Sequence, residues 1–215
     1  MSKSTLHITQ DFTLEAEKEF TPLDYFVLLL LVMSFPLGLI LPIEIGWENH
    51  ILEISQVIIL LIGAGICCSF AQGSLRNMWY SLAGIYCLVA GRELSWGRVF
   101  FPTGEVTDDG PQFIPMHAVP YHQVIYLLIF LAMMVILFNL WKYVDFKLIS
   151  QVKVPMVSLG LCLLSIVVQW LGEHANLPGY SKPQGEVVEE LAEVACYLEG
   201  LWCCWYYGKE LKKLQ

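Results

Sequence analysis

Long apolar runs restrict most strongly how this chain can fold. Residues 124–140, for example, contain no charged side chain. Across all 215 residues, 56% are hydrophobic and only 15% are charged, whereas soluble domains average about a quarter charged residues. A helix of about 20 apolar residues matches the hydrocarbon thickness of a bilayer. The pattern therefore predicts an integral membrane protein.

The apolar runs predict an all-α fold, a polytopic transmembrane helix bundle with six spans. We expect one transmembrane domain at 21–208, with a tail at 1–20 before it, a second tail at 209–215 after it, and a long loop at 98–119. The six predicted helices cover residues 22–43, 49–70, 78–97, 120–141, 154–173 and 186–207.

Helix-end signals support several of these boundaries. Thr21, Pro22 and Asp24 offer an N-cap, a proline in the first turn and an acid at the third position. Pro36 is expected to kink the first helix. Gly208 is expected to follow the last residue of the final helix, where glycine is a common terminator.

Basic residues and tryptophans predict the same orientation. Nine Lys and Arg residues lie on the side that both termini share, and two lie on the other side, with Arg92 at a helix end. Because cytoplasmic loops of membrane proteins are rich in Lys and Arg, both termini should be cytoplasmic, in a bacterial inner membrane. Tryptophans also prefer the two membrane boundaries. We place Trp47, Trp96 and Trp170 at the outer boundary and Trp79, Trp141, Trp202 and Trp205 at the inner one.

Charge and cysteine usage narrow the possible partners. The net charge of −8 argues against nucleic acid as a partner. The bilayer is the expected environment, and Gly, Ala and Cys helix faces favour a homo-oligomer or a partner within a membrane complex. All seven cysteines fall inside apolar segments, which favours a packing role over disulfides.

Ionisable residues gather at one depth. In the predicted topology they lie in the outer thirds of five helices, while the inner halves are nearly free of ionisable groups. Buried charge in a bilayer is costly, so this asymmetry predicts a shared, outward-facing polar cavity. The predicted cavity residues are Glu53, Arg92, Glu93, His122, His174, Glu190 and Glu193.

A metal is one candidate occupant of this cavity. Carboxylate and imidazole ligands suit Zn or Fe, and inward Glu and His residues on facing helices build di-metal sites. The chain contains neither HExxH nor HxxEH. The candidate ligands are Glu53, Glu93, His117, His122, His174 and Glu190.

Several functions fit such a cavity. An interaction, sensor or structural subunit of a membrane assembly would hold the polar groups in Arg–Glu pairs. A metal-dependent enzyme would use them against a lipid or lipid-linked substrate. A small-solute or proton-coupled transporter needs a continuous polar path, but no clear internal repeat and no acid in the inner half is evident.

One motif carries a resemblance. The run Arg92-Glu93-Leu94-Ser95-Trp96-Gly97-Arg98 resembles a motif of uncharacterised bacterial multi-pass membrane proteins, in which an acidic pair or Arg-Glu precedes Ile/Leu-Ser-Trp-Gly. Those proteins also carry a Glu-Glu pair opening a last helix, matched by Glu189-Glu190, and an early acid in a span, matched by Glu53. The loop at 98–119 departs from the Asn-rich segment of that family. The resemblance implies a multi-pass fold and no particular activity.

Overall fold

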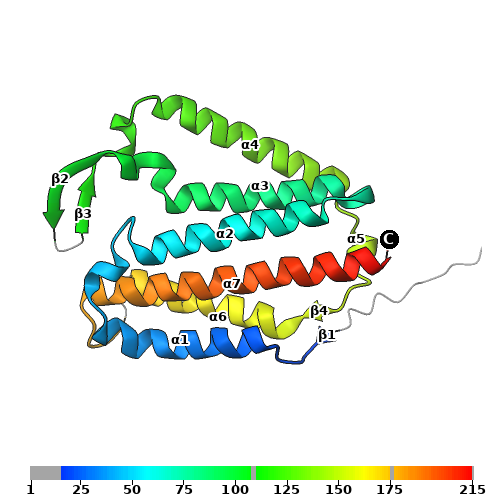
Figure 1. The fold of residues 1–215 in the computed structure, drawn as a ribbon, viewed down its shortest axis with the longest axis horizontal. Coiled ribbons are helices and arrows are strands. Elements are labelled where there is room, and N and C mark those ends of the chain that lie inside the picture. Colours follow the sequence, from blue (N-terminus) through cyan, green and yellow to red (C-terminus); the bar gives the residue numbers. More distant parts are fainter. Residues whose placement is uncertain (1–15, 108–109, 175–176, 215) are drawn as a thin grey trace, which may run out of the picture.

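The computed structural model describes residues 16–107, 110–174 and 177–214, so most of the predicted tail at 1–20 lies outside the described residues. Figure 1 shows the helices of this part running roughly side by side. The helices are α1 (Pro22–Ile40), α2 (Ile51–Phe70), α3 (Arg76–Glu93), α4 (His122–Tyr143), the short α5 (Phe146–Ile149), α6 (Met156–Glu173) and α7 (Lys182–Leu214). The short strands are β1 (Ala16–Glu17), β2 (Pro102–Thr107), β3 (Gly110–Phe113) and β4 (Val154–Pro155).

Helix α7 is the centre of the bundle. It packs against α1, α2 and α6, while α3 packs on α2 and α4 packs on α3 (Figure 1). We call the end that carries the β2–β3 hairpin the hairpin end, and the end where α7 finishes the C-terminal end. At the C-terminal end β1 pairs in parallel with β4.

Two apolar clusters hold α7 in place. One joins it to α1 and α6 and includes Leu31, Leu161 and Val188. The other lies toward the C-terminal end and includes Trp79 of α3 and Leu211 of α7. Burial of side chains of this size contributes about 1.5–3 kcal/mol each relative to water.

The predicted start of the first helix is confirmed in detail. The Thr21 hydroxyl accepts a hydrogen bond from the backbone N–H of Asp24 at 3.2 Å, and an Asp24 carboxylate oxygen accepts one from the N–H of Thr21 at 2.6 Å. This reciprocal capping box satisfies two N–H groups that a helix start leaves without partners. Pro36 lies within the continuous helix α1.

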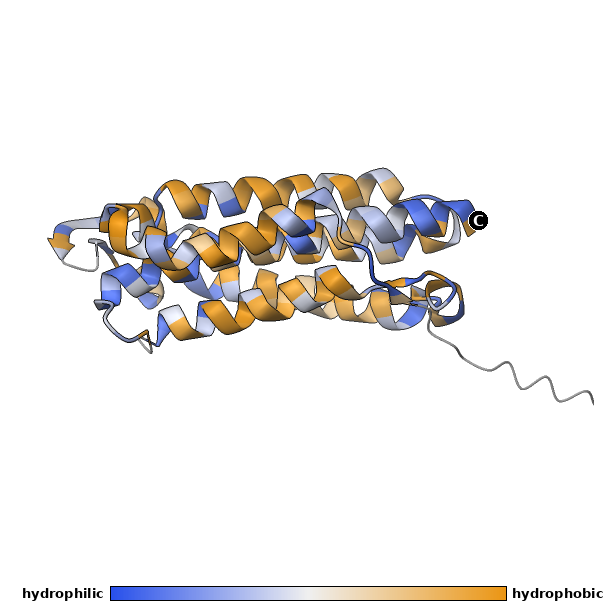
Figure 2. Ribbon diagram, turned by 90° about the horizontal axis from the view of Figure 1, so that it is seen from below, coloured by the Kyte–Doolittle hydropathy of each residue, from blue (hydrophilic) through white to orange (hydrophobic). Residues whose placement is uncertain are grey.

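The all-α fold class is confirmed, and the number of spans is shown only in part. Among the described residues, four helices are long and apolar enough to cross a membrane: α1, residues Ile43–Phe70, α4 and α6. Figure 2 shows hydrophobic ribbon along most of the helix bodies. No residue of α4 is buried, although the helix is strongly apolar. Such an apolar surface suits lipid contact.

Three expectations about helix ends and loop structure need correction. Helix α3 ends at Glu93, not at 97, because Ser95, Trp96 and Gly97 have positive φ angles of 45°, 55° and 87° that turn the chain. The expected loop at 98–119 contains the β2–β3 hairpin.

The third correction concerns Gly208, which does not terminate the last helix, since α7 continues to Leu214. A Cβ atom at Gly208 would lie 2.3 Å from the nearest atom of the Phe70 ring. This glycine is therefore needed for the close approach of α2 to α7, not for a turn.

Candidate functional site

A polar cavity opens at the hairpin end of the bundle. Its volume is about 560 Å³, within the range of roughly 300–1,000 Å³ that is usual for small-molecule sites. Helices α2, α3 and α7 supply its acids, and the turn after α3 and the start of α4 supply most of the rest. The described residues that line it are Glu53, Arg92, Glu93, Ser95, Trp96, Arg98, Met116, Tyr126, Glu189, Glu190 and Glu193.

Two glutamates of α7 are held by glutamine side chains from neighbouring helices. The Gln56 amide of α2, which is fully buried, donates to a carboxylate oxygen of Glu190 at 2.6 Å. The Gln169 amide of α6 donates to Glu193, which is also buried. Because glutamine is neutral, these bonds fix the carboxyl groups without supplying a positive charge.

Glu93 of α3 is fixed in the same way. The Tyr197 hydroxyl of α7 donates to a Glu93 carboxylate oxygen at 2.7 Å. Arg92 adds a guanidinium 3.4 Å from Glu193 and 3.9 Å from Glu93, and 60% of its side chain is exposed. An ion pair of this exposure contributes little net stability, because water screens it. Arg92 therefore moderates the negative charge of the cavity without neutralising it.

The turn after α3 brings a second arginine into the wall. Arg98 pairs with Glu48, and the Ser95 hydroxyl donates to the same carboxylate oxygen at 2.5 Å. The left-handed backbone of Ser95 and Trp96 is uncommon for residues other than glycine. It turns Trp96 back toward Gly91, whose Cβ position would lie 2.7 Å from the indole ring. The absence of a side chain at Gly91 thus makes room for an aromatic wall.

The predicted cavity residues are brought together in part. Glu53, Arg92, Glu93, Glu190 and Glu193 all line the cavity. His122 and His174 lie at the expected depth along the bundle, but neither lines the cavity. The His122 ring is at the start of α4, with Nδ1 3.3 Å from the Val119 carbonyl oxygen. The His174 ring lies tilted against Trp170, with its centroid 5.0 Å from the indole centroid.

The candidate metal ligands are likewise dispersed. His117 lies in the 3-10 turn Met116–Ala118 and is not among the lining residues. Within residues 16–107, 110–174 and 177–214, no group of three or more His, Cys, Asp or Glu side chains has a geometry that would hold a metal ion. The three histidines of the predicted Zn or Fe ligand set therefore do not line the cavity that its three glutamates line.

Some lining residues were not predicted. Met116 and Tyr126 come from the connection before α4 and from α4 itself, and a helical period does not indicate which way either faces. Glu189 and Trp96 were noted in the sequence but assigned to a helix start and a membrane boundary. In the structure both are in the cavity wall.

The fold and cavity together define a class: a helical bundle with four apolar, potentially membrane-spanning helices and an acidic cavity at one end. Comparisons with protein-family models, with curated proteins and with solved structures found no match.

Proposed function

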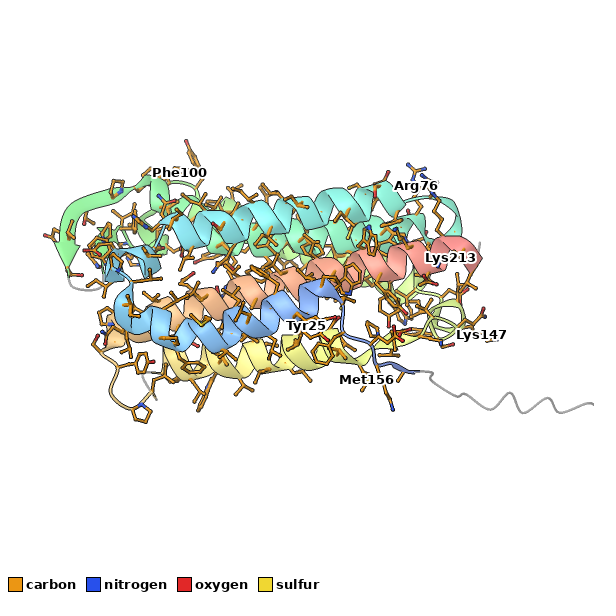
Figure 3. All side chains as sticks on the ribbon, turned by 60° about the horizontal axis from the view of Figure 1, so that its bottom comes forward. Tyr25, Arg76, Phe100, Lys147, Met156 and Lys213 are labelled. Atoms are coloured by element: carbon orange, nitrogen blue, oxygen red, sulfur yellow. The ribbon has the colours of Figure 1, made fainter. Side chains whose placement is uncertain are left out.

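We propose that the chain crosses the bilayer six times and that its hairpin end faces outward. Helices α3 and α7 run beside α2, so a bilayer that holds α2 also holds them (Figure 1). Figure 3 places Arg76, Lys147 and Lys213 at the C-terminal end, far from Phe100 at the hairpin end. Positive residues favour the cytoplasmic side. Both termini then lie in the cytoplasm of a bacterial cell, and the cavity opens on the opposite side.

We propose that this outward cavity binds a small organic cation, and that the protein is a ligand-binding sensor or interaction subunit in the membrane. One observation carries the proposal: five glutamates and two arginines line a single cavity. One of the two arginines, Arg98, is already paired with Glu48, which is not among the lining residues. The cavity therefore has a marked excess of carboxyl groups over guanidinium groups. A cationic ligand would favour the charged form of these carboxyl groups and pair with it.

The cavity walls favour an organic cation over a bare metal ion. The carboxylates are spread over α2, α3 and α7 and are tied individually to Gln56, Gln169 and Tyr197. A metal ion instead needs several ligands within about 2–2.6 Å of one point. The rings of Trp96 and Tyr126 also line the cavity, and aromatic faces attract ammonium groups.

Calorimetric titration with a polyamine tests the proposal. The full chain in lipid nanodiscs is titrated with spermidine, and separately with citrate as an anionic control. We expect spermidine to bind and citrate not to bind. Glu53→Gln removes one lining carboxylate while keeping its shape. It should weaken spermidine binding about tenfold, the change expected when a charged hydrogen bond of about 1.5 kcal/mol is lost.

Glu173→Gln is the matched control. Glu173 is an exposed carboxylate at the same end of the bundle and does not line the cavity. Its variant should bind spermidine as the original chain does. Equal weakening by both variants would show only a general surface-charge effect, and an absence of spermidine binding would remove the organic-cation proposal.

A further inference from the structure

A second pair of acids is buried between α1, α6 and α7, away from the outward cavity. Asp24 and Glu199 are both 0% exposed, and Ser158 beside them is 2% exposed. Both acids lie in the inner halves of the spans predicted at 22–43 and 186–207, so the expectation that no acid lies there is wrong. Asp24 lies in the first turn of α1, near the C-terminal end, and Glu199 lies near the middle of α7.

The two carboxyl groups differ in their contacts. Asp24 accepts two hydrogen bonds, from the Ser158 hydroxyl at 2.7 Å and from the backbone N–H of Thr21 at 2.6 Å. A carboxylate that only accepts hydrogen bonds is well suited to carry the negative charge. Glu199 has Asp24 and Ser158 as neighbours. Both are close enough to interact with it, but neither Glu199 oxygen makes a hydrogen bond of regular geometry to a described residue.

The charge balance requires an occupant. Among the described residues no ion pair involves Asp24 or Glu199. The other titratable groups that act on Glu199 are the thiols of Cys162, Cys196 and Cys203, which supply no positive charge. Each uncompensated buried charge costs several kcal/mol. Two carboxylates at this place therefore need a positive partner, and a proton on Glu199 removes one of the two charges at no steric cost.

A route to water lies beside the pair. A cavity of about 330 Å³ is lined by Thr21 and Ser158, which both bond to Asp24, and by Trp202 and Tyr206. Glu17 of β1 also lines it, so the cavity reaches the C-terminal end of the bundle. Figure 3 helps to locate this region: it labels Tyr25, next to Asp24, near the start of α1, and Met156, two residues before Ser158, at the start of α6.

We propose that Asp24 and Glu199 form an intramembrane proton-binding site that exchanges its proton with the C-terminal side of the membrane through this cavity. On release, the Glu199 O–H bond breaks and the proton passes to water that enters from the cavity past Ser158, and the same water then hydrates the two carboxylates. On uptake the reverse occurs. The site responds to proton availability on one side of the membrane only. It does not depend on the ligand of the outward cavity.

Infrared spectroscopy of the full chain in nanodiscs tests this assignment. At neutral pH, the difference spectrum between the original chain and Glu199→Gln should contain a C=O stretching band of a protonated carboxylic acid that the variant has lost. The matched control is Glu105→Gln, an exposed acid on β2, which should leave the band intact. A difference spectrum without such a lost band overturns the proposal, whatever band other carboxylic acids contribute to both spectra.

Two measurements on the original chain keep the test decisive should Glu199→Gln fail to fold. Transfer to D₂O should shift the band, because the cavity gives access to water, and an unshifted band would show a sealed pair that exchanges no proton. Replacing choline chloride by sodium chloride at fixed ionic strength should leave the band unchanged. Loss of the band in sodium would make Na⁺ the occupant and overturn the proton assignment.

Discussion

The contact between α6 and α7 near the cavity leads to a specific prediction about Gly172. A Cβ atom at this position would lie 2.6 Å from the Gly185 carbonyl oxygen and 2.9 Å from the Glu189 backbone nitrogen. Both atoms belong to the α7 backbone, so no rotation of a side chain can relieve the clash. Gly172→Ala must therefore move α6 away from α7 at the hairpin end.

The matched control lies on the same helix. Gly160 has no atom within 4 Å of its Cβ position, so Gly160→Ala should gain up to about 1 kcal/mol from helix propensity alone. Overpacking of a well-packed site costs typically about 1–3 kcal/mol. We expect Gly172→Ala to be less stable than Gly160→Ala by about 1–3 kcal/mol. The loss should be near the upper end of this range, because backbone atoms face the new methyl group.

Thermal unfolding in one detergent, followed by far-UV circular dichroism, measures this difference. For a chain of this size, each kcal/mol corresponds to about 2–4 °C in Tm. The midpoint of Gly172→Ala should thus lie several degrees below that of Gly160→Ala. Equal midpoints would show that α6 and α7 are not in backbone contact at Gly172, and the reasoning would be refuted.

Two further predictions concern helix packing and capping. Gly208→Ala should lower the free energy of unfolding by about 1–3 kcal/mol, because its methyl group would meet the Phe70 ring. Adding Phe70→Leu should recover part of the loss in a double-mutant cycle, whereas strictly additive losses would contradict the contact. Thr21→Ala should cost about 1 kcal/mol by removing the cap of α1. Thr21→Ser keeps the hydroxyl and should retain most of the stability in the same unfolding measurement, so equal losses in both variants would argue against the cap.

Local signals in the sequence predicted local structure well. The capping box at Thr21 and Asp24 is formed by residues three positions apart, so the sequence contains all of it. Gly208 misled the prediction because its partner is Phe70, on another helix. The pattern around a glycine does not distinguish a helix end from a close helix contact when the contact residue is distant in sequence.

The depth of a residue along the bundle was easier to predict than the direction it faces. Counting residues along each helix placed Glu53, Glu93, His122 and His174 near one end, and all four are there. Lining the cavity also requires the correct rotation about each helix axis, and that rotation is set by packing against neighbours. The two glutamates face the cavity, whereas His122 and His174 are turned elsewhere.

Glu199 was missed although the sequence contains a signal for it. Val188, Ala192, Ala195 and Glu199 follow one another at spacings of four, three and four residues, so they share one face of α7. The first three belong to the apolar cluster with α1 and α6. An acid on the same stripe is an exception to the apolar pattern, and buried acids in a membrane helix indicate function by default.

The position of α7 explains how one helix can carry acids on two faces. Glu190 lies on the side toward α2, where Gln56 contacts it, and Glu193 lies between α3 and α6, where Arg92 and Gln169 contact it. Glu199 lies on the side toward α1 and α6. A helix with these acids exposed to lipid would pay the full cost of burying charge in hydrocarbon. Because α7 packs against α1, α2 and α6, those more apolar helices separate its acids from the surrounding lipid. The same arrangement explains why α7 lacks the apolar composition of a spanning helix and can still cross the bilayer in the proposed topology.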